Sequence, residues 1–152
     1  MTQLKIGDFA PEINSIDQNG DNITLKQFKG KKIVLYFYPK DMTPGCTAQS
    51  CNLSENYVTL QNKGYEVLGV SCDSVKRHTK FIEKYNLPFS LISDEDQKVV
   101  KDYGVWGLKK FMGREYMGIS RNTYVIDEKG FISSVFDKVQ TKTHANDVLD
   151  VL

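Results

Sequence analysis

Apolar residues recur along the chain with two periods, one typical of buried strands and one typical of amphipathic helices. Residues 33–38 (IVLYFY) are six consecutive apolar residues, all β-branched or aromatic apart from Leu35, and predict a strand buried on both faces. Residues 65–71 (YEVLGVS) predict a second strand. Between them, an amphipathic helix is predicted from Thr43 to about Lys63. Its inward stripe consists of Cys46, Ser50, Leu53, Tyr57 and Leu60.

Turn signals place further elements before this central part. The polar residues 18–21 (QNGD) separate two segments of strand character, 8–16 and 22–25, which predicts an N-terminal β-hairpin. Thr24 and Gln27 have the spacing of a capping box, so a short helical turn should follow the hairpin.

The second half of the chain alternates helices and strands. Asp73 or Ser74 can cap a helix that ends at residues 86–88 (NLP). Its predicted apolar stripe consists of Val75, His78, Ile82 and Tyr85. The remaining predicted elements are a strand at 90–93, a helix from the acidic residues 94–96 to about 103, a hairpin of 123–127 with 131–136, and a helix over 143–152.

This order of elements is that of a thioredoxin-like α/β fold with an N-terminal β-hairpin extension and a central mixed sheet flanked by helices. The length is that of a single domain, residues 1–152. Residues 104–122 (GVWGLKKFMGREYMGISRN) match no regular element, and such a long loop is usually functional or disordered. Its large apolar residues argue against disorder. We expect it to fold over the active-site face with Trp106 and its aromatic neighbours in the core, a weak dimer contact being the alternative.

Composition and charge exclude several classes of function. The formal net charge is +1 with basic and acidic residues evenly mixed, which argues against nucleic-acid binding. The longest apolar run is six residues, far shorter than a membrane span. Residues 1–13 lack the pattern of a secretory signal. Three cysteines without such a signal indicate a reducing compartment, the cytoplasm, where a close cysteine pair is more often catalytic than structural.

The candidate chemistry lies where the first long strand meets the first helix. Thr43 followed by Pro44 is a helix-opening pattern, because a threonine oxygen can cap free N–H groups and proline at the first helical position loses no hydrogen bond. Cys46 then falls in the first turn. Helix N-termini lower the pKa of cysteine, and the thiolate is the nucleophilic form. The same N–H groups can hold an oxygen beside the sulfur.

The spacing of Cys46 and Cys51 constrains how they could react with each other. Five residues of ideal helix rotate about 140° and rise about 7.5 Å, which separates the two Cα atoms by about 8.7 Å. A disulfide needs about 4.4–6.8 Å. A bond between these cysteines therefore requires the first turns of the helix to unwind.

The segment PKDMTPGC (39–46) matches the peroxiredoxin motif of Pro, three residues, Thr, two residues and Cys. With Cys51 five residues further on, the chain resembles the atypical two-cysteine subfamily called bacterioferritin comigratory protein or peroxiredoxin Q. The resemblance continues through GDFAPEI, KYNLPFSLISD, YGVWG and GISRNTYVIDEKG. It implies a thioredoxin fold, reduction of hydrogen peroxide and alkyl hydroperoxides, and recycling by thioredoxin or a similar dithiol reductant. Neither a cofactor nor a metal is expected, and relatives are often monomeric.

The resemblance also implies a role for each residue of the motif. Cys46 resembles the peroxidatic cysteine, which attacks the O–O bond and becomes a sulfenic acid. Cys51 resembles the resolving cysteine, which condenses with that sulfenic acid to a disulfide. Thr43 resembles the threonine whose hydroxyl contacts the sulfur and the peroxide. Pro39 resembles the residue that shields the site, and Arg121 the arginine that holds the thiolate and the peroxide oxygen.

The position of Arg121 suits that role on physical grounds. It stands just before a predicted strand, and a guanidinium stays charged and presents its donors in a fixed fork. Without the cysteine motif, a surface arginine in a salt bridge would be the better interpretation. Gln49 occupies a position where many relatives carry glutamate, which we interpret as tolerated variation that could alter the local helix charge.

The other candidate residues have simpler interpretations. Cys72 ends a predicted strand and is interpreted as an inert packed thiol. His78 lies on an apolar stripe and is interpreted as a packing or boundary residue, whereas His144 opens the last helix without ligands nearby. The cysteines and histidines lack the paired short spacings of structural zinc sites.

Two alternative functions remain open from the sequence. A general thiol–disulfide oxidoreductase would share the fold and the position of the nucleophile. Against it, Cys46 and Cys51 lack the C-x-x-C spacing, and residues 121–123 (RNT) contain no proline before the hairpin strand. A redox sensor or holdase would use the same oxidation to expose surface, and the sequence does not exclude it as a second role.

Overall fold

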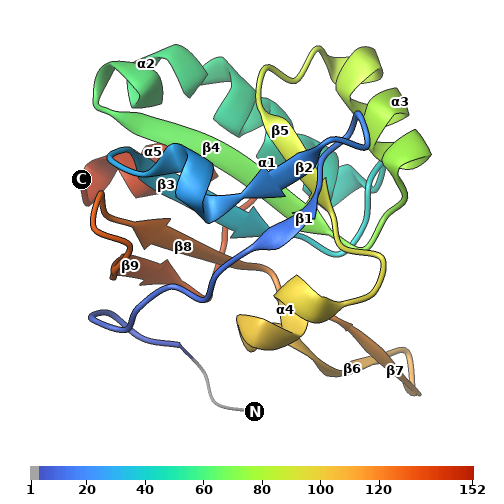
Figure 1. Cartoon of the computed structure of the whole chain (residues 1–152). Coiled ribbons are helices and arrows are strands. Elements are labelled where there is room, and N and C mark those ends of the chain that lie inside the picture. The colour runs from blue at the N-terminus through green and yellow to red at the C-terminus, as the bar shows by residue number, and fades with distance from the viewer. Residues whose placement is uncertain (1–3) are drawn as a thin grey trace.

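The computed structural model describes residues 4–152; residues 1–3, part of the segment inspected for a signal, lie outside the described residues. A mixed seven-stranded sheet runs in the order β2-β1-β5-β4-β3-β8-β9 (Figure 1). Its strands are β1 (Asn14–Ile16), β2 (Asn22–Thr24), β3 (Lys32–Phe37), β4 (Tyr65–Ser71), β5 (Ser90–Ser93), β8 (Asn122–Ile126) and β9 (Ile132–Phe136). The helices are η1 (Leu25–Phe28), α1 (Pro44–Glu55), α2 (Tyr57–Asn62), α3 (Val75–Tyr85), α4 (Lys98–Asp102) and α5 (His144–Asp150).

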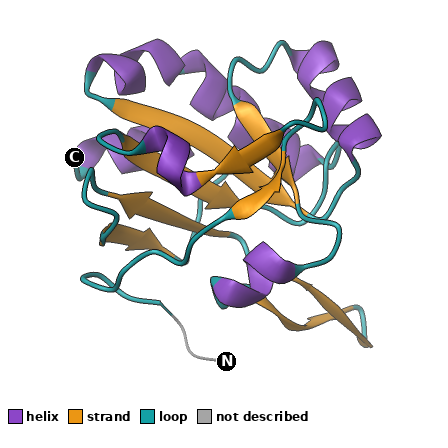
Figure 2. Cartoon of the chain, viewed as in Figure 1, coloured by secondary structure: helices purple, strands orange, loops and turns teal. Residues whose placement is uncertain are grey.

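The central strand β3 is buried on both faces, as its run of apolar residues predicts. Ile33, Leu35 and Phe37 belong to one core cluster, and Val34 and Tyr36 to the other. Because successive side chains of a strand point to opposite faces, one continuous apolar run supplies both layers. β3 pairs in parallel with β4 and antiparallel with β8. Helices cover both faces of the sheet, which confirms the predicted thioredoxin-like α/β architecture (Figure 2).

The predicted N-terminal hairpin and capping box are both confirmed. β1 and β2 pair antiparallel, and the hairpin is shorter than the residues 8–16 and 22–25 that predict it. Thr24 and Gln27 exchange the two capping-box hydrogen bonds at the start of η1. The strands at 65–71 and 90–93, the hairpin of β8 with β9 and the final helix also form where they are predicted.

The long helix predicted from Thr43 to about Lys63 is interrupted at Asn56. The Asn56 side chain donates to the backbone carbonyl of Asn52 at 2.8 Å, and the backbone N–H of Asn56 donates to the carbonyl of Leu53 instead of continuing the helical pattern. Asparagine side chains compete in this way with the helical hydrogen-bond ladder, so α1 ends and α2 begins here. Gly64, at φ +87°, then ends α2 near the predicted position.

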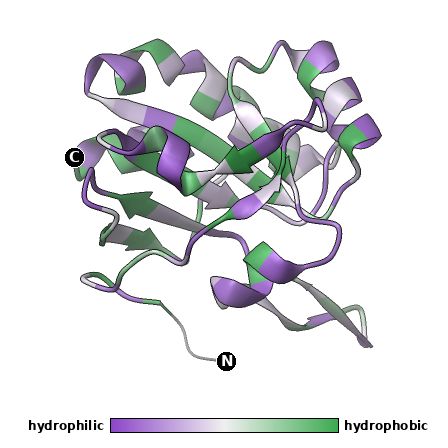
Figure 3. Cartoon of the chain, viewed as in Figure 1, coloured by the Kyte–Doolittle hydropathy of each residue, from purple (hydrophilic) through white to green (hydrophobic). Residues whose placement is uncertain are grey.

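The apolar stripe predicted for the helix after Asp73 and Ser74, which is α3, is shifted from its expected position. His78 and Phe81 are the buried residues of α3, whereas Val75, Ile82 and Tyr85 are only partly buried. The helix therefore faces the sheet through the i, i+3 pair of His78 and Phe81. Hydrophobic and hydrophilic residues share the surface of this helix (Figure 3).

Residues 106–119 form a second, two-stranded sheet, so the expectation that residues 104–122 contain no regular element is wrong. β6 (Trp106–Phe111) pairs antiparallel with β7 (Arg114–Ile119), and the hairpin points away from the main sheet below α4 (Figure 1). Met112 and Gly113 both have positive φ, the geometry of a two-residue type I′ turn. Met-Gly is not one of the residue pairs that signal this turn, which is why the sequence pattern missed it.

The hairpin is also far more exposed than expected. Trp106 packs, partly buried, against the core, and Ile119 at the end of β7 is buried in it. The exposed apolar side chains are Leu108, Phe111, Met112, Tyr116 and Met117. The prediction that the aromatic residues of this segment lie in the core is therefore wrong for Phe111 and Tyr116.

Within residues 4–152, no helix combines the length and the apolar character needed to cross a membrane.

Candidate active site

Cys46 lies in the first turn of α1, at the carboxyl end of the parallel strands β3 and β4. Thr43 occupies the N-cap position with extended backbone, and Pro44 is the first helical residue. The Thr43 side chain does not cap the helix as predicted; its hydroxyl donates instead to the Lys40 carbonyl at 2.8 Å. The first-turn N–H groups beside the buried Cys46 are thus not taken by a side-chain cap. Such groups favour an anion or a polarised oxygen.

Arg121 comes directly before β8 and reaches the Cys46 sulfur. Its Nη2 lies 3.3 Å from Cys46 Sγ, and its Nη1 donates to Gln49 Oε1 at 2.6 Å. Because β8 pairs with β3, the rigid sheet places a residue 75 positions away beside the thiol. The guanidinium presents a fixed positive charge to the sulfur.

Gln49 is a residue that the sequence analysis undervalued. It is fully buried one turn after Cys46, and its amide oxygen fixes the orientation of the Arg121 guanidinium. Within the described residues, its Nε2 has no hydrogen-bond partner. The neutral amide of Gln49 holds the Arg121 guanidinium without neutralising its charge. The glutamine at position 49, where many relatives carry glutamate, is therefore part of the site. Its helical spacing from Cys46 was the signal available in the sequence.

Cys51 lies on the same unbroken helix as Cys46, and both thiols are free. Cys46 is buried, whereas Cys51 is partly exposed and off the inward stripe. Burial, and after it the Glu55 carboxylate, raises the pKa of the Cys51 thiol. An intact α1 holds the two cysteines at helical spacing, which is too wide for a disulfide.

Pro39 follows β3 and is partly buried, in the loop that leads to Thr43. The structure therefore brings Cys46 and Arg121 into contact and places Thr43 at the start of the helix that carries the sulfur.

Comparison with known proteins identifies this arrangement. The model of the AhpC/TSA family matches residues 6–135. The chain belongs to this family.

Its relatives are peroxiredoxins that align over nearly their whole length. This peroxiredoxin is 46% identical to Peroxiredoxin Bcp of Escherichia coli (strain K12) over 152 residues, which cover 100% of this chain and 97% of that protein. It is 43% identical to Peroxiredoxin Bcp of Bacillus subtilis (strain 168) over 149 residues, 98% of this chain and 95% of the relative. The resemblance to the bacterioferritin comigratory protein subfamily is thereby confirmed.

Solved structures of the same subfamily share the fold. A cysteine-to-serine mutant of PrxQ from Xylella fastidiosa matches with a TM-score of 0.92 and 30% identity, covering 99% of this chain and 96% of that one. A structure of the Xanthomonas campestris bacterioferritin comigratory protein, from work on its alkyl peroxide reduction activity, matches with a TM-score of 0.86 and 33% identity, covering 91% and 88% of the two chains.

Two further candidate residues of this peroxiredoxin, Cys72 and His144, have no hydrogen bond to the Cys46 sulfur in the part of the chain that the structure describes. Burial raises the pKa of Cys72 to about 12, with Asp94 and Asp73 adding to the effect. This protonated, partly buried thiol fits the inert interpretation. His144 is buried and its Nε2 lies 2.8 Å from the Thr123 hydroxyl. Burial lowers the pKa of His144 to about 4, against the opposing effect of Asp147.

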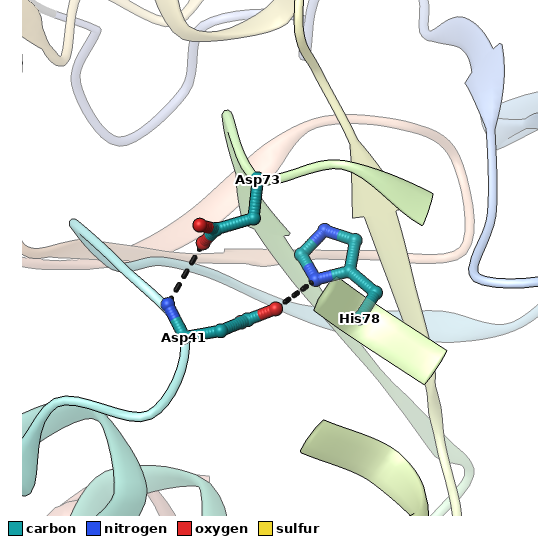
Figure 4. Close-up of side chains that lie close together, drawn as sticks. All are labelled: Asp41, Asp73 and His78. Atoms are coloured by element: carbon teal, nitrogen blue, oxygen red, sulfur yellow. Dashed lines mark hydrogen bonds and ion pairs between the residues drawn. The ribbon is translucent and has the colours of Figure 1, made fainter. Parts of the chain in front are cut away.

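Asp41 is a buried residue of the motif segment that the sequence analysis left without a role. It stands between Pro39 and Thr43, and its carboxylate faces His78 of α3 (Figure 4). The signal was present in the sequence as an acidic residue in a short loop that directly follows a buried strand.

Proposed function

We propose that this peroxiredoxin is a thiol peroxidase in which Cys46 reduces hydrogen peroxide and alkyl hydroperoxides. The observation that carries the proposal is the 3.3 Å contact of Arg121 Nη2 with Cys46 Sγ at the N-terminal turn of α1. The guanidinium and the free N–H groups of the turn stabilise negative charge on the sulfur and on an oxygen beside it. Both stabilising effects are needed when a thiolate attacks an O–O bond, because the sulfur is negatively charged before the attack and the leaving oxygen becomes so during it.

In the first step the Cys46 thiolate attacks one peroxide oxygen. An S–O bond forms, the O–O bond breaks, and the second oxygen takes up a proton and leaves as water or alcohol. The sulfur is oxidised to a sulfenic acid while the peroxide is reduced. Thr43 contacts the peroxide through its hydroxyl, Pro39 limits access of water, and Arg121 holds the leaving oxygen.

In the second step Cys51 resolves the sulfenic acid. Its sulfur attacks the Cys46 sulfur, the S–O bond breaks, and water leaves with the thiol proton. The resulting disulfide is reduced by thioredoxin or a similar dithiol protein. We propose a monomer that acts in the cytoplasm, where three free thiols are compatible with the reducing conditions.

The substrate class is supported by a relative and by the chemistry of the site. Alkyl peroxide reduction is the activity studied with the Xanthomonas campestris bacterioferritin comigratory protein. In this chain the groups that surround the sulfur interact with the O–O bond and with the negative charge that develops on the leaving oxygen. Hydrogen peroxide and alkyl hydroperoxides have both features in common.

The proposal is tested by replacing Cys51 with serine and adding peroxide. Without a resolving thiol, a sulfenic acid should accumulate on Cys46, where mass spectrometry after trapping with dimedone will detect it. Cys46→Ser is the control and should give no adduct and no peroxide consumption. Peroxide consumption by the native protein without an adduct on Cys46 in the Cys51→Ser variant would place the chemistry on another residue.

A further inference from the structure

The loop between β3 and α1 is anchored at its midpoint by a buried carboxylate. Asp41 is completely buried, and its Oδ1 accepts a hydrogen bond from the Tyr38 hydroxyl at 2.6 Å. Its Oδ2 lies 2.6 Å from Nδ1 of His78, which is also completely buried. Figure 4 shows the imidazole and the carboxylate facing each other. Both carboxylate oxygens are therefore used inside the protein.

The backbone of Asp41 is held from the same side. Its N–H donates to Asp73 Oδ2 at 2.8 Å, and its carbonyl accepts from Arg77 Nη2 at 3.1 Å. Asp73 is fixed in turn by the Ser71 hydroxyl at 2.7 Å and by Arg77 Nε at 3.0 Å. Apart from Tyr38, every anchor of this residue comes from the end of β4 or from α3.

Hydrogen bonds satisfy both buried side chains of the pair. His78 Nε2 lies 3.0 Å from the carbonyl oxygen of Ile92, which can only accept, so Nε2 carries a hydrogen. Asp41 Oδ1 accepts from the Tyr38 hydroxyl, and the hydrogen bond between Asp41 Oδ2 and His78 Nδ1 gives a partner to every polar atom of the two buried side chains. A buried pair of this kind adds little net stability over apolar residues of the same shape, because desolvation offsets the attraction.

The same side chains do not form a metal site. Ligand atoms of Asp41, Asp73 and His78 all lie within 4.8 Å of one another. Two ligands about 2.0–2.1 Å from a tetrahedral metal ion would be more than about 3 Å apart, since the ion sits between them. The 2.6 Å between Asp41 and His78 is a hydrogen-bond distance.

The anchor sets the conformation of the residues that follow it. Met42 has φ +68°, a left-handed conformation that is strained for a side chain of this kind. Such strain persists only where the surrounding structure fixes it, and it is common at active sites. The bend at Met42 directs the chain into Thr43, whose hydroxyl closes back on Lys40, and then into α1.

We propose that Asp41, held by His78, is a positioning residue for the reaction of Cys46 with peroxide. It fixes the loop that carries Pro39 and Thr43, so the pocket is formed before peroxide arrives. This inference rests on the proposed function, because it takes Cys46 as the reacting thiol. Since these anchors lie outside α1, the loop keeps its place while α1 unwinds and rewinds.

The experiment compares two reactions of Cys46 in the Cys51→Ser background, with and without Asp41→Ala. Hydrogen peroxide requires the aligned pocket, whereas iodoacetamide requires only a reactive sulfur. A displaced pocket should lower the second-order rate constant with peroxide by about 10- to 100-fold, the scale of a misplacement of about 1 Å. The rate constant with iodoacetamide should change less than about threefold. Quenched-flow mass spectrometry of the Cys46 peptide measures both.

Ile132→Ala is the matched control for lost stability. Ile132 is buried in β9 within the core cluster on the other face of the sheet, and its truncation leaves a cavity far from the loop. It should leave both rate constants at the level of the Cys51→Ser parent. A peroxide rate constant of Asp41→Ala within twofold of the parent would overturn the proposal, as would an equal loss in both reactions.

A second pair of variants keeps the test valid if Asp41→Ala does not fold. His78→Asn retains an N–H donor near the position of Nδ1, whereas His78→Leu removes it. The asparagine variant should recover most of the peroxide rate constant that the leucine variant loses, and equal rate constants would overturn the positioning role. If the Cys51→Ser parent does not react with peroxide at Cys46, the proposed function fails as well. If the parent reacts and the variants react at the same rate as the parent, the positioning role alone fails.

Discussion

At the scale of single residues, the arrangement around Cys46 depends on how one guanidinium is divided between two partners. Arg121 donates through Nη2 to the sulfur and through Nη1 to Gln49. Because Gln49 is neutral, it fixes the orientation of the guanidinium and leaves its positive charge uncompensated for the sulfur. A peroxide oxygen that approaches the sulfur therefore meets a preorganised donor.

Arg121→Ala should lower the second-order rate constant of Cys46 with hydrogen peroxide by about 100-fold or more, because a preorganised donor to the developing charge is lost. Stopped-flow measurements under single-turnover conditions check this, with circular dichroism to show that the fold is retained. Arg114→Ala, at an exposed arginine of β7, is the control and should react like the native protein. An unaltered rate constant in Arg121→Ala would refute the assigned role.

His144 should make stability depend on pH. In the folded protein its pKa is lowered from 6.5 to about 4 by burial, so below pH 6.5 the unfolded chain binds a proton that the folded chain does not. Stability is therefore lost as pH falls from about 6.5 towards 4, by up to about 3 kcal/mol at 1.36 kcal/mol per pKa unit.

Urea unfolding of the native protein and of His144→Gln between pH 7 and pH 4 isolates this contribution. Glutamine cannot titrate, and its amide can replace Nε2 as a partner of Thr123. The free energy of unfolding of the native protein should fall more steeply with decreasing pH than that of the variant. Parallel curves would contradict the predicted effect of burial.

At the scale of secondary-structure elements, α1 carries Cys46 as the proposed nucleophile, Cys51 as its proposed partner, and the contacts that keep both in a helix. The Ser50 hydroxyl lies 2.9 Å from the Tyr36 hydroxyl beneath the helix. Asn52 Oδ1 accepts from the backbone N–H of Ala145 at 2.7 Å, at the start of α5. The break at Asn56 separates α1 from α2, so α1 can unwind without α2.

Oxidation to the Cys46–Cys51 disulfide should unwind α1 and release its tie to α5. Hydrogen–deuterium exchange should show faster exchange over residues 46–55 in the oxidised protein and also at Ala145, whose N–H loses the Asn52 acceptor. The amides that join β3 and β4 are the internal control and should remain protected. An oxidised protein with α1 protected as in the reduced form would exclude unwinding.

At the scale of the whole molecule, two core clusters pack on opposite faces of the sheet. They hold in place the carboxyl ends of β3 and β4, where the site lies. The tight packing is clearest at Gly69 in the middle of β4. A Cβ atom there would lie 2.6 Å from Leu91 Cδ2 and 2.8 Å from Tyr36 Cζ. No larger residue fits without movement of these two side chains, one of which supports Ser50 in α1.

Gly69→Ala should destabilise the protein by about 1–3 kcal/mol, because the added methyl group overpacks the core. Thermal unfolding followed by circular dichroism measures the loss. Gly118→Ala in β7 is the matched control: its Cβ would approach Lys109 Cδ at 3.1 Å and Tyr116 Cε2 at 3.2 Å, and these two side chains lie on the exposed hairpin, where they can shift by a few tenths of an ångström. The control should change stability by less than about 0.5 kcal/mol. Equal stability of the two variants would contradict the packing argument.

The sequence by itself determined the elements and the residues that local chemistry defines. Strand β3 follows from one apolar run, η1 from a capping box, and the position of Cys46 in a first turn from the Thr-Pro pair before it. These signals lie within a few residues of one another, so they can be interpreted without knowledge of the fold. The contact of Arg121 with the Cys46 sulfur was also expected from the sequence, through the resemblance of its segment to a known family.

Only the tertiary structure decided which distant side chains meet. Asp41 meets His78 across 37 positions, and Arg121 meets Gln49 across 72, because the pairing of strands and the docking of α3 bring them together. The β6–β7 hairpin was equally hidden, since its Met-Gly turn carries no local signal. Hydrogen bonds between residues far apart in the chain depend on sheet order and helix docking, which no short segment of sequence specifies.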